Sequence, residues 1–210
     1  MSPESTVPSA ASAAGGARLR RAGGGGGQEC AVGVLVSGTG TNLQALIDAG
    51  LPIGGVISSN THAQALERAE SAGIDTAVFD LKDYTTREDR DEAMADWLQE
   101  RGVDLVVCAG FMWLLRDNFL ERFPNRVVNT HAAYLPEFPG ASPVADALAA
   151  GARETGATVH LVDSGIDSGP IIAQERVPIE PGDTVDTLWP RVKHVEHRLL
   201  ARVVGELCAR

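Results

Sequence analysis

The chain has 210 residues, of which 44% are hydrophobic, and this size and composition suit one globular domain with or without tails. Its 28 acidic and 18 basic residues give a formal net charge of −10, and 5% of the residues are aromatic. Nucleic acid and anionic membrane surfaces are therefore disfavoured as partners, whereas small-molecule substrates, including anionic ones held by local dipoles, remain open.

The first segment, residues 1–28, is rich in Ser, Ala, Pro and Gly and ends in consecutive glycines at 23–27. This composition predicts a disordered tail, so we expect the folded domain over 29–210. The arginines at 18, 20 and 21 precede no apolar stretch of the kind that a secretory signal needs. No segment approaches the roughly 18 apolar residues of a membrane span, and we expect a cytoplasmic protein.

From residue 29 onward, short apolar runs alternate with helix-like stretches. The predicted strands are 30–36, 53–59, 75–79, 103–109, 126–130, 157–162 and 171–179. The predicted helices are 41–49, 62–72, 85–100, 116–122, 143–150 and a last one from about 184 to near the C-terminus. This alternation predicts an α/β fold, a three-layer sandwich around a mostly parallel, Rossmann-like sheet, with the last two strands antiparallel at its edge.

The three cysteines, Cys30, Cys108 and Cys208, are widely spaced and form no CxxC motif, so we expect reduced thiols, with Cys108 as a small core residue. The histidines lack the spacing of a metal site, and no metal is predicted. His194 and His197 are expected on a solvated helix face. No GxSxG motif suggests a serine nucleophile.

A glycine-rich segment, Ser37-Gly-Thr-Gly-Thr-Asn-Leu43, separates the first strand from the first helix. Glycine allows close backbone approach to a ligand, and a helix N-terminus offers free N–H groups to an anion. The dinucleotide-binding motif would need a third glycine where Leu43 stands, which favours a single phosphate over a pyrophosphate. A plain strand-to-helix turn with an N-cap explains the segment equally well.

Asn129 and His131 lie two residues apart at the end of a predicted strand, so their side chains leave the same face. Asp167 follows another strand-like run, and its spacing does not by itself bring it close. An amide, an imidazole and a carboxylate together suit transfer of a carbonyl carbon between amines, with a protonated His131 stabilising an oxyanion. The alternatives are a half-buried histidine and a turn aspartate. His160 suits a core position or a supporting contact to this trio.

Five ordered motifs then carry a family resemblance: residues 37–43, Ala109-Gly-Phe-Met112, Asn129-Thr-His131, Leu135-Pro-x-x-Pro-Gly140, and Thr158-Val-His-x-Val with Asp167-x-Gly-Pro170. Over about residues 30–207 the chain resembles the phosphoribosylglycinamide formyltransferases, folate-dependent enzymes of purine synthesis. The resemblance implies their formyltransferase fold and 10-formyltetrahydrofolate as co-substrate. The phosphate-type loop points to glycinamide ribonucleotide as the formyl acceptor.

The resemblance also implies residue roles. The catalytic trio is Asn129, His131 and Asp167, with His160 behind it. The acceptor and its phosphate fall to Gly40, Thr41, Asn42, Lys193, His194, Val195 and Glu196. Folate contacts fall to Arg87, Met112, Trp113, Leu114, Leu115, Asn129, Asp163, Ser164, Gly165, Ile166 and Asp167.

The chain departs from the family pattern at several positions. Trp113 stands where an arginine or lysine is expected beside the folate segment. Ala132 and Ala133 follow His131 where a proline and then a serine or alanine are usual, so we expect a less constrained histidine. Ser142-Pro143 and Ala145 replace a stretch that often carries histidine and arginine. The chain also ends at Arg210, without a C-terminal strand pair common in the family.

Three alternatives stay open at this point. One is hydrolysis of the same folate, although a hydrolase usually carries an N-terminal regulatory domain and residues 1–28 are too short for one. Another is formyl transfer to a different, phosphorylated amine. The third, from another functional class, is a binding or regulatory module without turnover. Oligomeric state does not follow from the sequence.

Overall fold

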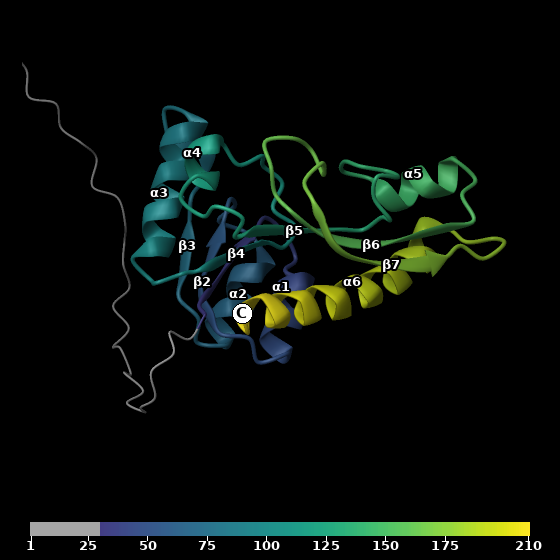
Figure 1. Cartoon of the computed structure of the whole chain (residues 1–210), viewed down its shortest axis with the longest axis horizontal. Coiled ribbons are helices and arrows are strands. Elements are labelled where there is room, and N and C mark those ends of the chain that lie inside the picture. Colours follow the sequence, from purple (N-terminus) through teal and green to yellow (C-terminus); the bar gives the residue numbers. More distant parts are fainter. Residues whose placement is uncertain (1–29) are drawn as a thin grey trace, which may run out of the picture.

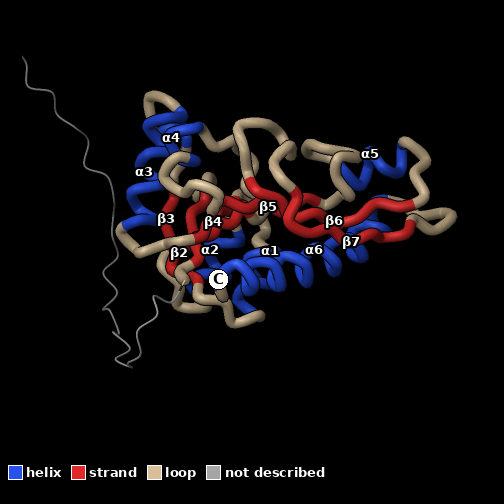
Figure 2. The backbone as a smooth tube through the Cα atoms, viewed as in Figure 1, coloured by secondary structure: helices blue, strands red, loops and turns tan. Residues whose placement is uncertain are grey.

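The structure, a computed structural model, describes residues 30–210, so the tail predicted over 1–28 lies outside the described residues. Its centre is a seven-stranded sheet in the order β3-β2-β1-β4-β5-β6-β7 (Figures 1 and 2). The strands are β1 (Val32–Val36), β2 (Ile53–Ser58), β3 (Thr76–Val78), β4 (Leu105–Cys108), β5 (Val127–His131), β6 (Glu154–Leu161) and β7 (Ile171–Pro178).

Helices connect and cover these strands. They are α1 (Thr41–Asp48), α2 (Gln64–Ser71), α3 (Arg87–Gln99), α4 (Asp117–Leu120), α5 (Pro143–Ala149) and α6 (Val185–Cys208). A short 3₁₀ turn at Leu81–Asp83, which the sequence did not predict, begins where Asp80 accepts a hydrogen bond from the Lys82 N–H. The α3 helix begins with a reciprocal capping box between Thr86 and Asp89.

The predicted three-layer α/β sandwich is confirmed. One side of the sheet packs against α1, α2 and α6, through a core that includes Val34 of β1 and Leu200 of α6. The opposite side packs against α3 and α4, through a second core that includes Leu35 and Phe119. Successive residues of β1 thus point into different cores, as the alternation of a strand buried on both faces requires.

The sheet is parallel from β3 to β5, and β6 and β7 are antiparallel, as predicted. The antiparallel register sets Asn129 of β5 opposite His160 of β6. Because β6 is antiparallel to β5, it ends with Leu161 opposite Val128, near the start of β5. The loop after β6 then turns back along β5 and brings Asp167 to Asn129, whose Nδ2 lies 3.2 Å from Asp167 Oδ1.

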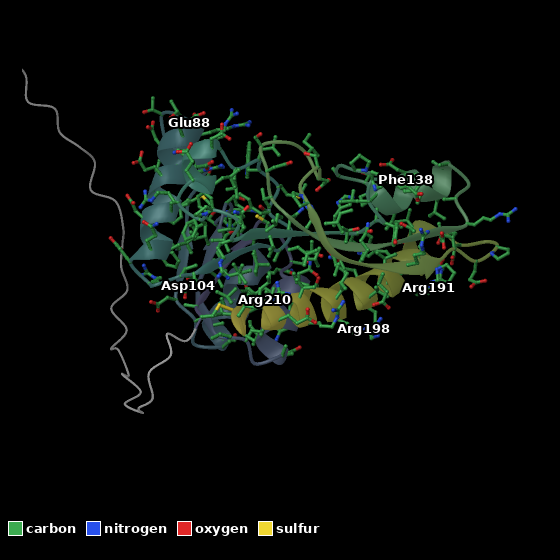
Figure 3. All side chains as sticks on the ribbon, viewed as in Figure 1. Glu88, Asp104, Phe138, Arg191, Arg198 and Arg210 are labelled. Atoms are coloured by element: carbon green, nitrogen blue, oxygen red, sulfur yellow. A yellow bond between two sulfur atoms is a disulfide. The ribbon has the colours of Figure 1, made fainter. Side chains whose placement is uncertain are left out.

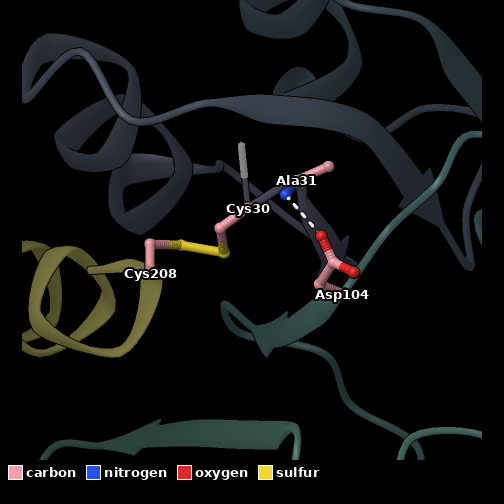
Figure 4. The surroundings of a disulfide bond; sticks show 4 residues. All are labelled: Cys30, Ala31, Asp104 and Cys208. Carbon is pink, nitrogen blue, oxygen red and sulfur yellow. Dashed lines mark hydrogen bonds between the residues drawn. A yellow bond between two sulfur atoms is a disulfide. The ribbon is translucent and has the colours of Figure 1, made fainter. Parts of the chain in front are cut away.

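The expectation that the cysteines are reduced is wrong for two of the three. Cys30 and Cys208 form a disulfide, with their Cα atoms 5.2 Å apart, that links the segment before β1 to the end of α6 (Figure 4). The neighbouring Ala31 N–H donates to Asp104 Oδ2 at 3.1 Å. Cys108 is free and buried, as predicted. Sequence spacing could not reveal the pairing, because 178 positions separate the two cysteines.

The prediction for the last helix needs one correction. His194 is exposed, but His197 is partly buried, and its Nε2 has no hydrogen-bond partner among the described residues. Burial lowers the pKa of the His197 imidazole below its ordinary value.

Candidate active site

A cavity of about 390 Å³ lies at the carboxyl ends of β4 and β5. The strands that follow β1 in sequence first extend the sheet on one side, as β2 and β3, and then on the other side, as β4 and β5. Open α/β sheets bind ligands at the carboxyl ends of the strands where the order reverses in this way. The cavity walls are residues 42, 108, 110–115, 129–132, 140, 141, 143, 160, 162, 163, 165–167, 189, 193 and 196.

His131, the last residue of β5, has an oxygen atom facing each of its ring nitrogens. Its Nε2 lies 2.8 Å from the Phe138 carbonyl oxygen, and its Nδ1 lies 3.4 Å from Asp167 Oδ2. A doubly protonated ring can donate to both oxygens at once. Ala132, which follows His131, is buried, and the His131 ring is contacted at both nitrogens.

Asp167 has a backbone φ of 51°, in the left-handed region that is unfavourable for a residue with a side chain. Its Oδ2 accepts from the Gly140 N–H at 2.9 Å, and its Oδ1 accepts from Asn129 Nδ2 at 3.2 Å. Burial would raise the pKa of this carboxyl, but the His160 ring, the Gly140 N–H and nearby His131 together hold the pKa below its ordinary value. An ionised carboxylate is therefore kept beside His131.

His160 fixes the orientation of the Asn129 amide. Its Nδ1 lies 2.8 Å from the Leu161 carbonyl oxygen, which requires a proton on Nδ1, and its Nε2 lies 3.6 Å from Asp167 Oδ1. The Asn129 Nδ2 lies 3.2 Å from that Nε2. His160 thus lies beside the trio and in the cavity wall, the supporting position predicted for it, and it is 2% exposed.

A smaller cavity of about 190 Å³ adjoins the first and is lined by residues 37–42, 109, 110, 112 and 193. Between the two, Glu196 is 3% exposed, and its Oε1 accepts from Asn42 Nδ2 at 3.2 Å and from Thr130 Oγ1 at 3.1 Å. The Lys193 Nζ lies 2.9 Å from its other carboxylate oxygen. The glycine-rich loop and α6 therefore meet through a buried charged network.

The opposite wall of the main cavity is apolar and open. Met112 is 67% exposed and Ile166 is 60% exposed, an accumulation of exposed apolar surface that indicates a ligand-binding face. The expected cation at position 113 is replaced from α3, because the Arg87 and Arg90 guanidinium carbons lie 5.2 and 5.6 Å from the Trp113 ring centroid. Such contacts stabilise an indole and add positive charge near the wall.

The structure does not bring every predicted site residue to the main cavity. Gly40 and Thr41 line the smaller one. Arg87 contacts Trp113 rather than the cavity, and Ser164 is absent from its walls. His194 and Val195 line a separate cleft between α6 and β7, because residues 193 and 196 occupy the helix face that points inward.

Sequence reasoning also missed several groups in the site. Thr130 and Gly140 stood inside two of the quoted motifs, which was the signal available for them. Trp189 lines the cavity from α6 without any motif. The Phe138 carbonyl could not be found from sequence, because a backbone oxygen is common to every residue and only the loop conformation, with φ of 55° at Phe138, directs it at His131.

Cys108 lines the cavity, but burial raises the pKa of its thiol to about 12, which keeps it protonated and a poor nucleophile. Among residues 30–210, no group of three or more His, Cys, Asp or Glu side chains is placed to hold a metal ion. Within the same range, no helix combines the length and apolar character needed to cross a bilayer. The Asn129 amide, the His131 imidazole and the Asp167 carboxylate all lie in the walls of the main cavity.

This geometry agrees with the comparisons to known proteins. Residues 31–204 match the sequence profile described as "Formyl transferase". The chain belongs to the formyl transferase family. The predicted family and fold are therefore confirmed, and the formyl transferase profile covers most of the described fold, from the segment before β1 into α6.

Two relatives and one solved structure show how similar this chain is to named proteins. The chain is 46% identical over 178 residues to "Phosphoribosylglycinamide formyltransferase" of Mycobacterium tuberculosis, covering 83% of each protein. It is 44% identical over 173 residues to "Trifunctional purine biosynthetic protein adenosine-3" of Gallus gallus, covering 80% of this chain but 17% of that longer protein. The crystal structure of glycinamide ribonucleotide transformylase 1 from Symbiobacterium toebii matches with a TM-score of 0.85 at 43% identity, covering 88% of this chain and 90% of that one.

Proposed function

We propose that this protein transfers the formyl group of 10-formyltetrahydrofolate to the amine of glycinamide ribonucleotide in purine biosynthesis. The observation that carries the proposal is the convergence of Asn129, His131 and Asp167 on one cavity, between an apolar wall and a glycine-rich loop. The relatives named phosphoribosylglycinamide formyltransferase support it, since they match the chain over most of its length.

In the proposed reaction, the acceptor amine attacks the formyl carbon and gives a tetrahedral oxyanion. Asn129 and protonated His131 donate hydrogen bonds to this oxygen. The oxygen replaces the Phe138 carbonyl as the partner of His131 Nε2, and it replaces either Asp167 Oδ1 or His160 Nε2 as a partner of Asn129 Nδ2. Asp167 keeps His131 charged and, through water, takes up the proton that the amine loses. As the bond from the formyl carbon to the folate nitrogen breaks, the proton taken from the amine passes through the same water to that nitrogen, which completes the transfer.

The two ends of the cavity suit the two substrates. The small cavity lined by Gly40, Thr41 and Asn42 offers main-chain N–H groups for the acceptor phosphate. Glu196, buried and between the two cavities, suits an amide or ammonium group of the acceptor. Trp113 offers flat apolar surface for the folate ring system, and Met112 and Ile166 add exposed apolar side chains beside it.

We also propose a cytoplasmic location, in keeping with the purine biosynthetic role of the relatives. The Cys30–Cys208 disulfide is the feature that favours an oxidising compartment instead. Cell fractionation followed by detection of the protein separates the two locations.

The function is tested by a formyl-transfer assay with purified protein, 10-formyltetrahydrofolate and glycinamide ribonucleotide. We expect turnover that requires the ribonucleotide, measured as release of tetrahydrofolate together with formylated acceptor. A reaction without acceptor identifies a hydrolase and refutes the proposal. Folate binding without transfer to the ribonucleotide refutes it as well and directs attention to other phosphorylated amines.

A further inference from the structure

The loop of residues 37–40, which joins β1 to α1, is held from behind by α2. The Gly38 carbonyl accepts from the Ala65 N–H at 3.1 Å. Gly40 has a φ of 72°, and a Cβ added there would lie 2.5 Å from the Ala65 Cβ. Only glycine permits this approach, so the loop and the first turn of α2 form one packed unit.

Arg68, one turn further along α2, holds the next carbonyl of the loop. Its Nε donates to the Thr39 carbonyl oxygen at 2.8 Å, and its NH1 donates to Gln44 Oε1 of α1 at 3.1 Å. Among the ion pairs of residues 30–210, none includes Arg68. Its charge is therefore directed at the loop and α1 instead of being neutralised by a carboxylate.

These contacts orient the peptide groups of the loop. In a planar trans peptide, the N–H points opposite to the C=O. Because the Gly38 and Thr39 carbonyls point at α2, the N–H groups of Thr39 and Gly40 point away from it. The small cavity is lined by these loop residues and by neither Ala65 nor Arg68, so it lies on the side away from α2.

The same cavity has a second feature of a ligand-binding site. Asn42, whose residue is 3% exposed, lines it, and its Oδ1 has no hydrogen-bond partner among the described residues. A buried amide oxygen without a partner is costly unless a ligand donates to it. The cavity thus combines oriented N–H donors for an anion with an acceptor for a neighbouring hydroxyl or amine.

We propose that Arg68 is a positioning residue for a phosphate monoester bound in the small cavity. This proposal rests on the proposed function, because it identifies the phosphate monoester as the phosphate group of the acceptor. Arg68 does not touch the ligand. It pulls the Thr39 carbonyl back, which directs the Gly40 N–H at the phosphate, and its charge polarises the same peptide.

The test compares three variants in direct binding of ribose 5-phosphate, measured by calorimetry, with unphosphorylated ribose as the ligand control. Arg68→Met removes the contact, and Arg68→Lys retains a charged donor. Arg202→Met removes the same charge from an exposed Arg202–Glu206 pair on α6, remote from the loop. We expect Arg68→Met to weaken ribose 5-phosphate binding about 10- to 100-fold, the effect of one charge-assisted hydrogen bond.

Arg68→Lys should recover part of the affinity, and Arg202→Met should bind within about twofold of wild type, since an exposed pair contributes little. In turnover, the KM for the acceptor should rise in Arg68→Met while kcat and the KM for the folate stay unchanged. Equal ribose 5-phosphate affinity in wild type and Arg68→Met overturns the proposal. So does a joint loss of acceptor and folate affinity with a lower unfolding temperature.

The two hypotheses fail separately in this design. A wild-type protein that binds ribose 5-phosphate in an Arg68-dependent way but formylates no glycinamide ribonucleotide refutes the proposed function and leaves the role of Arg68 intact. If the wild type is active but Arg68→Met changes neither the acceptor KM nor ribose 5-phosphate binding, then the role of Arg68 is refuted and the proposed function stands.

Discussion

The buried pair of Arg90 and Asp91 allows a quantitative stability test. Both side chains are 0% exposed. The Arg90 Nε and NH2 donate to Asp91 Oδ1 at 2.9 and 2.6 Å, and Asp91 Oδ2 accepts from the Arg116 N–H at 2.8 Å. The guanidinium also lies 5.8 Å from the Phe111 ring centroid. Arg90→Met keeps much of the apolar packing but leaves a buried carboxylate with one remaining donor.

Removing one partner of a buried ion pair costs about 3–5 kcal/mol. For a domain of this size, that corresponds to a fall in unfolding temperature of about 6–20 °C. The free energy of unfolding is measured by urea titration followed by circular dichroism. The double variant Arg90→Met with Asp91→Asn removes the charge that was left alone, so it should be more stable than Arg90→Met by a large part of that cost.

The matched control is Arg198→Met, whose arginine lies on the outer surface of α6 and pairs with Glu175 (Figure 3). Its side chain is 54% exposed, so we expect a loss of at most about 1 kcal/mol. If Arg90→Met and Arg198→Met lose equal stability, or if adding Asp91→Asn recovers nothing, then the cost does not come from an unpaired buried charge and the reasoning fails.

Three further outcomes follow from the site and the disulfide. His131→Ala and Asp167→Asn should each lower kcat by about a hundred- to a thousandfold in the transfer assay, while circular dichroism shows that both variants stay folded; near-normal turnover in either would remove these residues from the mechanism. The folded-state pKa of Asp167 lies below its ordinary value of 3.8, so its contribution to stability is present above that pH and is lost as the pH falls through the folded-state pKa. In acid titrations of the free energy of unfolding, Asp167→Asn should therefore be destabilised less by acid than wild type. Identical dependence of this free energy on pH in the two proteins would argue against the assignment. The Cys30–Cys208 disulfide closes a loop of 178 residues, which contributes about 5 kcal/mol to stability in the chain-entropy model. A reductant should therefore lower the unfolding temperature of wild type but not of Cys30→Ser. An equal response in both would show that the disulfide does not stabilise the fold.

Much of the fold followed from hydrophobic periodicity. Continuous apolar runs such as 103–109 predicted buried strands, and Gly40 and Gly102 marked where helices begin or end. The boundaries differ by a few residues, and β6 starts at Glu154 rather than at 157, because antiparallel pairing with β7 extends it beyond the apolar run. Pairing partners are a tertiary property that local sequence does not carry.

The candidate site was predictable where residue type limits the chemistry. Asn129 and His131 share a strand end, and the distance of 3.4 Å between His131 Nδ1 and Asp167 Oδ2 agrees with the predicted trio, whose catalytic role stays a prediction. The surroundings were not predictable in the same way. The Phe138 carbonyl depends on a loop conformation, and the cations around Trp113 come from α3, about 25 positions earlier in the chain.

The two cores that flank the sheet become complete at different times during synthesis. The buried core beneath α3 and α4 draws on residues between 35 and 127, so its parts exist once Val127 has been made. The core beneath α1 and α2 needs Leu199 to Val204 of α6, which appear only after the intervening residues 128–204. At about 5–20 residues per second, these 77 positions take about 4–15 s to translate. During that interval, the apolar surface of β1 and α1 that α6 covers in the finished fold is exposed, so this is the stage of synthesis at which the growing chain is most open to aggregation.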